Sequence, residues 1–213
     1  MNAEKKAYQS IINLILSGEY SPGDFLLETD ISVKLGMSRT PVSKALSMLV
    51  NEGFLNKMPK KGCYIPLPTP QDAEQVFYAR KSVESFAAEA AALNASENEI
   101  IELSEIVRND EVALSLNNKD LYFNTNEDFH IRVAMASHNI YIEKWVRNIF
   151  LRSHIYIFFF DSFYRFGKND IPQKTPVQHR SIVEAIKERN PKKASELMKE
   201  HIEWTYTSLI QKI

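Results

Sequence analysis

Three histidines occupy positions from which a helical chain could bring their imidazoles together. The stretch NEDFH places Asn126 and His130 four residues apart, on one face of a helix. His179 and His201 each lie eleven residues from Asn190, which precedes a proline. Residues equidistant from the turn of an antiparallel helical pair lie opposite each other, here about 16 Å from the turn, so we expect His179 and His201 to face each other. With a third imidazole from a neighbouring helix they would form a divalent-metal site in a bundle core; the alternative is three unrelated helical histidines.

A second chemical feature is the stretch GMSRTPVSKAL (36–46), where an arginine and a proline stand at the start of a predicted helix. Ser38 is a good N-cap whose hydroxyl can accept from a first-turn amide, and Pro41 is tolerated because those amides lack intrahelical acceptors. Arg39, Thr40 and Ser43 then project from the exposed end of the helix. In a helix-turn-helix this end enters the major groove, where the guanidinium fork of arginine matches guanine. An ordinary capped surface helix is the alternative.

The elements that would position this arginine form one N-terminal unit, residues 1–68. Apolar spacing predicts helices over 5–17, 28–35 and 38–52, and the stretch FLNKMPKKGCYIPL predicts a small β-hairpin. Helix, helix, turn, helix and hairpin are the layout of a winged helix-turn-helix. In the wing, Lys60 and Lys61 would contact phosphates, with a solvated turn as the alternative.

The proline-rich stretch IPLPTP (65–70) predicts a stiff connector to a second unit, residues 71–213. Ser96 and Glu99 form the pattern of a capping box. The expected helices cover 71–93, 96–116, 119–136, 139–166, 177–189 and 191–211. The fold class is therefore mainly α, with an N-terminal winged helix-turn-helix and a C-terminal all-α antiparallel bundle. Within it, the aromatic run HIYIFFFDSFYRF (154–166) is expected to form core and dimer interface.

Composition bounds the class of protein. The chain has 213 residues, 44% of them hydrophobic, and a net charge of −1, which suits a packed core rather than a disordered chain. Residues 37–61 nevertheless hold five basic residues and one acidic residue, a local patch suited to a polyanion. The charged N-terminus, the absence of a long apolar run and the single Cys63 predict a cytoplasmic protein with no membrane segment.

The segment from residue 18 to residue 55 resembles the DNA-binding domain of GntR-type bacterial transcription regulators. The residues that carry the resemblance are Gly23, Glu28, Leu35, Gly36, Ser38, Arg39, Thr40, Pro41, Val42, Ala45, Leu46, Glu52 and Gly53. The resemblance implies DNA contacts by Ser38, Arg39 and Thr40, and by Lys60, Lys61 and Gly62 of the wing, where the glycine would stand at the hairpin tip. The chain departs from the family at Ser43 and Lys44, which replace the usual Arg-Glu, so the operator sequence cannot be carried over.

The second unit is similar to the FCD ligand-binding domain of the FadR-type branch of that family. Its signatures appear as Arg80/Glu84, NEDFH, HRSIVEAI (179–186) and EHI (200–202). The resemblance implies a divalent metal, zinc or nickel, held by His130, His179 and His201. Asn126 stands where the family has a metal-binding aspartate, and Glu127 is a conceivable substitute ligand. Arg80 is expected to reach an effector cavity, or else to form a structural ion pair with an acid of the bundle.

These observations predict a non-enzymatic regulator: a homodimer that binds double-stranded operator DNA, acts as a repressor, and responds to a small carboxylate metabolite bound near the metal. One alternative is a metal-responsive repressor in which the metal itself is the signal, although Asn126 argues against it. Another is a metal-dependent hydrolase, which would leave the first 68 residues unexplained and lacks an obvious general base.

Overall fold

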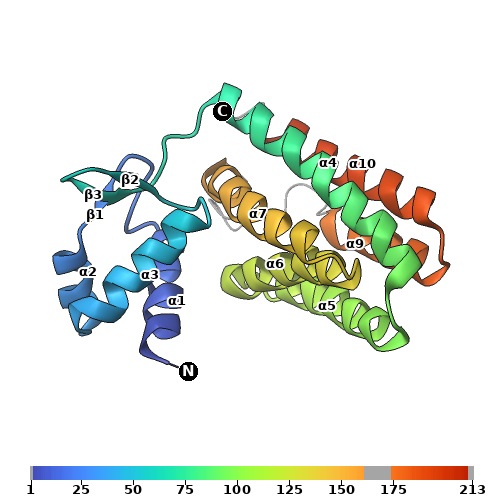
Figure 1. The fold of residues 1–213 in the computed structure, drawn as a ribbon, viewed down its shortest axis with the longest axis horizontal. Helices are drawn as coiled ribbons and strands as arrows, with labels where there is room; N and C mark the ends of the chain where they lie inside the picture. The colour runs from blue at the N-terminus through green and yellow to red at the C-terminus, as the bar shows by residue number, and fades with distance from the viewer. Residues whose placement is uncertain (1, 161–173, 211–213) are drawn as a thin grey trace. The chain divides into compact units, whose positions relative to one another are not determined.

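The computed structural model describes residues 2–160 and 174–210, and the chain divides into two compact units, Met1–Thr69 and Pro70–Ile213. The chain is mainly helical, with one small antiparallel sheet in the first unit (Figure 1), which confirms the predicted fold class.

The first unit is built on α1 (Ala3–Leu16), α2 (Glu28–Leu35) and α3 (Arg39–Asn51). Gly36 ends α2 in the left-handed conformation, with φ of 61°, which lets the chain turn directly into α3. Helix α3 packs on both α1 and α2. The apolar stripes of the three helices meet in a core made of Ala7, Ile11, Ile15, Ile31, Val42, Ala45, Leu46 and Leu49.

The sheet has three strands in the order β1-β3-β2: β1 (Phe25–Leu26), β2 (Asn56–Met58) and β3 (Gly62–Tyr64). The hairpin of β2 and β3 was predicted, with Asn56 opposite Tyr64 and Met58 opposite Gly62. Strand β1 was not predicted, because two residues are too few to display alternation. It adds to the outer side of β3, so the sheet ties the wing to the segment ahead of α2.

The second unit consists of helices that run alongside one another. They are α4 (Pro70–Asn94), α5 (Glu97–Ser115), α6 (Lys119–Ala136), α7 (Ile140–Phe160), α9 (Thr175–Lys187) and α10 (Pro191–Ile210). The longest packing runs along α4 and α10 (Figure 1). On α4 the small side chains of Ala87, Ala88, Ala91 and Ala92 are buried, and small side chains allow close approach of neighbouring helices. The capping box of Ser96 and Glu99 is present.

Parts of two sequence predictions fall on residues that the structure does not describe. The expected helix over 139–166 is observed as α7 up to Phe160, and 161–166 lie outside the described residues, as does residue 211 of the last expected helix. Of the aromatic run, residues 154–157 are buried inside the second unit. None of the helices described here is both long and apolar enough to cross a membrane.

Candidate functional site

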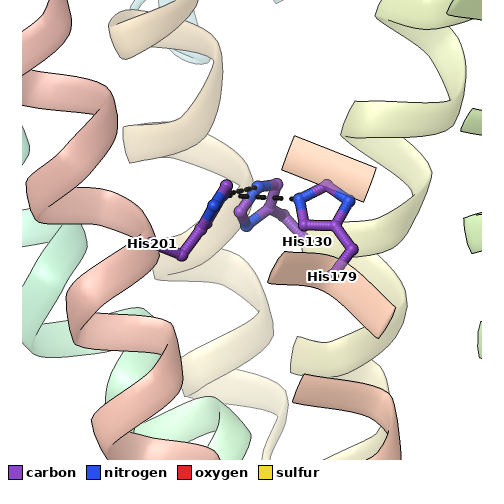
Figure 2. Close-up of side chains that lie close together, drawn as sticks. All are labelled: His130, His179 and His201. Atoms are coloured by element: carbon purple, nitrogen blue, oxygen red, sulfur yellow. Dashed lines mark hydrogen bonds between the residues drawn. The ribbon is translucent and has the colours of Figure 1, made fainter. Parts of the chain in front are cut away.

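Three helices of the second unit bring His130, His179 and His201 into one cluster (Figure 2). His130 comes from α6, His179 from α9 and His201 from α10. The Nε2 atom of His201 lies 3.4 Å from that of His179 and 3.4 Å from that of His130. One ligand nitrogen from each ring lies within 4.8 Å of the other two. The pair expected to face each other across the turn at Asn190 therefore does so.

The outer nitrogen of each ring has its own acceptor. The Nδ1 atom of His179 donates to Asp110 Oδ2 at 2.7 Å, that of His130 donates to Glu84, and that of His201 lies 3.1 Å from Gln178 Oε1. An ionised carboxylate can only accept, so the Nδ1 atoms of His130 and His179 carry the hydrogen. In a neutral ring the Nε2 atom then holds a lone pair, and these lone pairs converge.

Burial favours the neutral form of His130 and His201. It lowers the pKa of His130 to about 4, against the opposing effect of Glu84, and it lowers the pKa of His201 well below its usual range, helped by the two neighbouring histidines. For Glu84, burial alone would raise the pKa, but Arg80 and His130 together lower it to about 2. At neutral pH His130 and His201 are therefore unprotonated, and His130 lies beside the ionised carboxylate of Glu84.

The donor set fits a divalent metal ion. Imidazole nitrogens bind zinc at about 2.0–2.1 Å, and two such ligands at tetrahedral angles are about 3.3–3.4 Å apart. The two shortest Nε2 separations match this spacing. Converging lone pairs repel one another unless a cation lies between them, and a hydrogen-bonded outer nitrogen is the usual arrangement for metal-binding histidines. The three side chains could thus hold a metal ion.

Arg80 lies beside this cluster, fully buried on α4. Its guanidinium forms an ion pair with Glu84, donates to Ser153 Oγ at 2.9 Å and lies 3.4 Å from His130 Nε2. The structural ion pair considered from the sequence is therefore present. Arg80 also lines a small cavity of about 30 Å³, together with Asn126, His130 and His201. That volume holds about two water molecules.

The remaining ligand candidates differ in position. Asn126 is buried and lines the same cavity, and no hydrogen bond is seen between its side chain and the described residues. Glu127, the conceivable substitute, is half-buried and is not part of the histidine cluster.

In the first unit, the N-terminal end of α3 is exposed. Arg39 and Thr40 are exposed residues of its first turn, and no ion pair joins Arg39 to the described part of the chain. Ser38 occupies the N-cap position, but its side chain makes no capping hydrogen bond, so the expected hydroxyl-to-amide contact is wrong. The extended backbone at Ser38, with φ of −66° and ψ of 158°, still begins the helix there.

The two residues that depart from the family pattern are engaged within the unit. Ser43 donates to Glu28 at 2.7 Å, and Lys44 pairs with Glu4. In the wing, Lys60 and Lys61 are exposed, and Lys60 adopts a positive φ of 65° in the turn closed by the Lys61 amide and Met58 carbonyl. Gly62 is the first residue of β3, one position past that turn rather than at its tip.

Sequence reasoning missed three partners of this site: Asp110, Gln178 and Ser153. Asp110 carried a readable signal, because it follows Ile100, Leu103 and Val107 on the apolar stripe of α5, where a carboxylate is unexpected. Gln178 and Ser153 had no comparable signal, since polar residues at these positions fit an ordinary bundle.

Comparisons with known proteins agree with both halves of the chain. Residues 3–65 match the model of bacterial regulatory proteins of the gntR family, and residues 75–203 match the FCD domain. The Uxu operon regulator of Haemophilus influenzae is 29% identical over 208 residues, covering 89% of this chain and 75% of that protein. The transcriptional repressor RspR of Escherichia coli is 26% identical over 110 residues, covering 52% of this chain and 48% of RspR.

A solved structure, E. coli McbR/YncC, superposes with a TM-score of 0.80 at 18% identity and covers 99% of this chain and 98% of its own. At that identity the likeness concerns the fold. The two domain matches span almost the whole chain and set a DNA-binding unit ahead of a helical FCD unit. The chain therefore belongs to the GntR family of bacterial transcriptional regulators, as a member with an FCD domain.

Proposed function

We propose that the protein is a regulator of the FadR-type branch whose operator binding is controlled by a small carboxylate metabolite bound at a metal ion in the FCD domain. The observation that carries the proposal is the convergence of three buried Nε2 atoms beside Arg80 and a small cavity. His130, His179 and His201 would hold the ion, with Asn126 as an additional, uncharged ligand. Zinc or nickel suits three imidazoles, and the 3.4 Å separations favour the tetrahedral geometry of zinc.

The effector would occupy the open side of the metal. The cavity beside His130 and His201 admits a carboxylate-sized group, and Arg80 is the cation among its described lining residues. When bound, the metal would supply a positive charge for the carboxylate. A larger effector would have to move the side chains that line the cavity, and such a movement gives effector binding a structural consequence.

The DNA-binding proposal rests on the exposed cations of the first unit. Arg39 would read a base edge from the start of α3, with Thr40, Ser38, Ser43 and Lys44 at the same end. Lys60, Lys61 and Gly62 of the wing would lie against the backbone. Since Ser43 and Lys44 already have partners in Glu28 and Glu4, most of the specific contact falls to Arg39.

The protein is proposed to be a homodimer, which two half-sites of an inverted repeat require. An apolar groove of about 400 Å³ on the second unit supports this and would be covered by a second copy of the chain. Phe86 and Leu93 of α4 and Trp145 of α7 line it, and all three are about 60% exposed. Exposed aromatic patches of this kind are typical of protein interfaces.

Control by the effector requires that it bind the DNA-competent and DNA-incompetent arrangements with unequal affinity. We propose repression that is relieved by the effector. In the alternative, the metal itself is the signal. The small size of the cavity beside Arg80 favours this alternative, because about 30 Å³ leaves little room for an organic effector.

The deciding experiment selects genomic fragments with the purified, metal-loaded protein at near-physiological salt. Recovery of a short inverted repeat beside a few genes supports the regulator, and the enzymes that those genes encode nominate candidate carboxylates. Binding to that operator is then measured with each carboxylate at constant metal, in wild type and in His179→Ala. A response to carboxylate that the variant loses supports the proposal; a response to metal alone supports the alternative; sequence-independent, salt-labile binding contradicts both.

A further inference from the structure

Asp110 is the most deeply buried carboxylate near the histidine cluster. It lies on α5, its side chain has no exposed surface, and its Oδ2 atom accepts the Nδ1 hydrogen of His179 at 2.7 Å. Its Oδ1 atom has no hydrogen-bond partner among the residues described. An uncompensated buried carboxylate is costly, so its presence calls for a positive charge nearby.

The other buried carboxylate of the cluster is already balanced. Glu84 forms an ion pair with Arg80, and both side chains are 1% exposed. Asp110 has no such partner: no lysine or arginine of the described residues pairs with it, and His179 is its one ion-pair candidate there. Among the residues that the structure describes, Asp110 therefore leaves one negative charge beside the three histidines, and the cluster itself is what can compensate it.

We propose that Asp110 is a positioning residue for the metal centre, and that it supplies from outside the ligand shell the negative charge that Asn126 lacks within it. This inference rests on the proposed metal site. The Asp110 carboxylate fixes the Nδ1–H form of His179, aims Nε2 at the ion and makes that nitrogen a stronger metal ligand. Phe129 stacks on the face of the His179 ring, with 3.6 Å between the centroids, and so sets the plane of the ring. The hydrogen bond to Asp110 then selects which of the two flipped orientations the ring adopts.

Substitutions at Asp110 separate its charge from its hydrogen bond. In Asp110→Asn the amide oxygen can still accept from His179 Nδ1, so orientation remains and charge is lost. In Asp110→Ala both are lost. The matched control is Glu111→Gln: Glu111 is the next residue of α5, pairs with Arg180 of α9 on the surface, and loses the same charge without touching a histidine.

The experiment titrates each full-length protein with Zn²⁺ in competition with a chromophoric chelator, and records the visible spectrum of the Co²⁺-loaded forms. We expect Asp110→Asn to bind zinc about 10- to 100-fold more weakly, as for other outer-shell partners, while its Co²⁺ spectrum stays like that of wild type. Asp110→Ala should bind still more weakly and change the spectrum. Glu111→Gln should stay within about twofold of wild type.

An Asp110→Asn affinity within about twofold of wild type, or an equal loss in Glu111→Gln, overturns the inference. If Asp110→Ala does not fold, Asp110→Asn still decides, because it keeps the hydrogen bond. Failure of the proposed function looks different: wild type itself then binds no zinc, or His179→Ala binds it equally well, and both proposals fall together.

Discussion

Replacing Glu84 by glutamine should destabilise the second unit far more than a surface charge change. The carboxylate of Glu84 contacts both Arg80 and His130, and all three side chains are 1% exposed. Glutamine keeps the volume but removes the counter-ion, so the guanidinium of Arg80 remains buried without a compensating charge. Breaking a buried pair in this way costs about 3–5 kcal/mol.

The size of the unit converts that cost into a measurable shift. The second unit, Pro70–Ile213, is close in size to domains of about 150 residues, for which 1 kcal/mol corresponds to a shift of about 2–4 °C, so the thermal transition should fall by about 6–20 °C. Tryptophan fluorescence isolates the relevant unit, because both tryptophans of the chain, Trp145 and Trp204, lie in it. The measurement is made on metal-free protein, so that altered metal binding does not contribute.

The matched control is Glu203→Gln, which removes the exposed partner of Lys81 on the same pair of helices, α4 and α10. Surface pairs contribute at most about 1 kcal/mol, so this variant should shift the transition by a few degrees at most. If Glu84→Gln costs no more than Glu203→Gln, the Arg80–Glu84 pair is not the isolated buried charge pair described here. A double variant, Arg80→Met with Glu84→Leu, should recover much of the loss, since both charges of the pair are then removed together.

Three further outcomes are expected. Arg39→Ala should abolish specific operator binding, whereas Lys61→Ala should weaken binding to all sequences and flatten the slope of log affinity against log salt by about one unit. Both are measured by fluorescence anisotropy across a salt series. Retained operator affinity in Arg39→Ala refutes the placement of Arg39 in the major groove of the DNA. Trp145→Glu should turn the proposed homodimer into monomers in sedimentation experiments, because it places a charge in the apolar groove. If wild type and variant are dimers alike, the dimer interface lies elsewhere. Burial, reinforced by Arg80, lowers the pKa of His154 from about 6.5 to about 3. Between pH 6.5 and pH 3 the imidazole is therefore protonated in the unfolded chain but not in the folded one. The free energy of unfolding falls as the pH falls through this range. The loss is about 2 kcal/mol between pH 6.5 and pH 5, and urea unfolding of metal-free His154→Phe should show a shallower pH dependence than wild type.

Helical periodicity and chain breakers were enough to predict most elements of the fold. The start of α5 follows from the capping box of Ser96 and Glu99. Strand β1 escaped prediction because it is only two residues long and exists through pairing with β3, a long-range contact that no local pattern records. At Ser38 the local sequence was also an incomplete guide: the residue type and the backbone conformation fit an N-cap, yet the side chain makes no capping hydrogen bond.

The parts of the candidate site whose positions follow from the regular rise and turn of a helix could be predicted from the sequence. The parts that depend on packing between distant segments could not. The opposition of His179 and His201 follows from equal spacing about Asn190. Which acceptor each outer nitrogen finds depends on how α5 and α4 pack against α9 and α6, so the pairing of Asp110 with His179 could not be read from spacing. The misplaced carboxylate on the stripe of α5 was the available hint.

The charges around the cluster also constrain the ligand. The Asp110 carboxylate contributes one negative charge, and the Arg80–Glu84 pair contributes none, so a divalent ion brings the net charge of the site to one positive. A bound monoanion makes the net charge of the site zero, whereas a bound dianion makes it one negative. Among the described residues that line the cavity, Arg80 is the single lysine or arginine, and it is already paired with Glu84, so these residues offer no free cation for the second charge of a dianion. We therefore expect the zinc-loaded protein to be stabilised more by a monocarboxylate than by a dicarboxylate of similar length, measured as the rise in its thermal transition at equal ligand concentration. Asp110→Asn should shift that preference toward the dicarboxylate, because it removes one negative charge from the site. An unchanged preference in that variant would show that ligand charge is selected elsewhere.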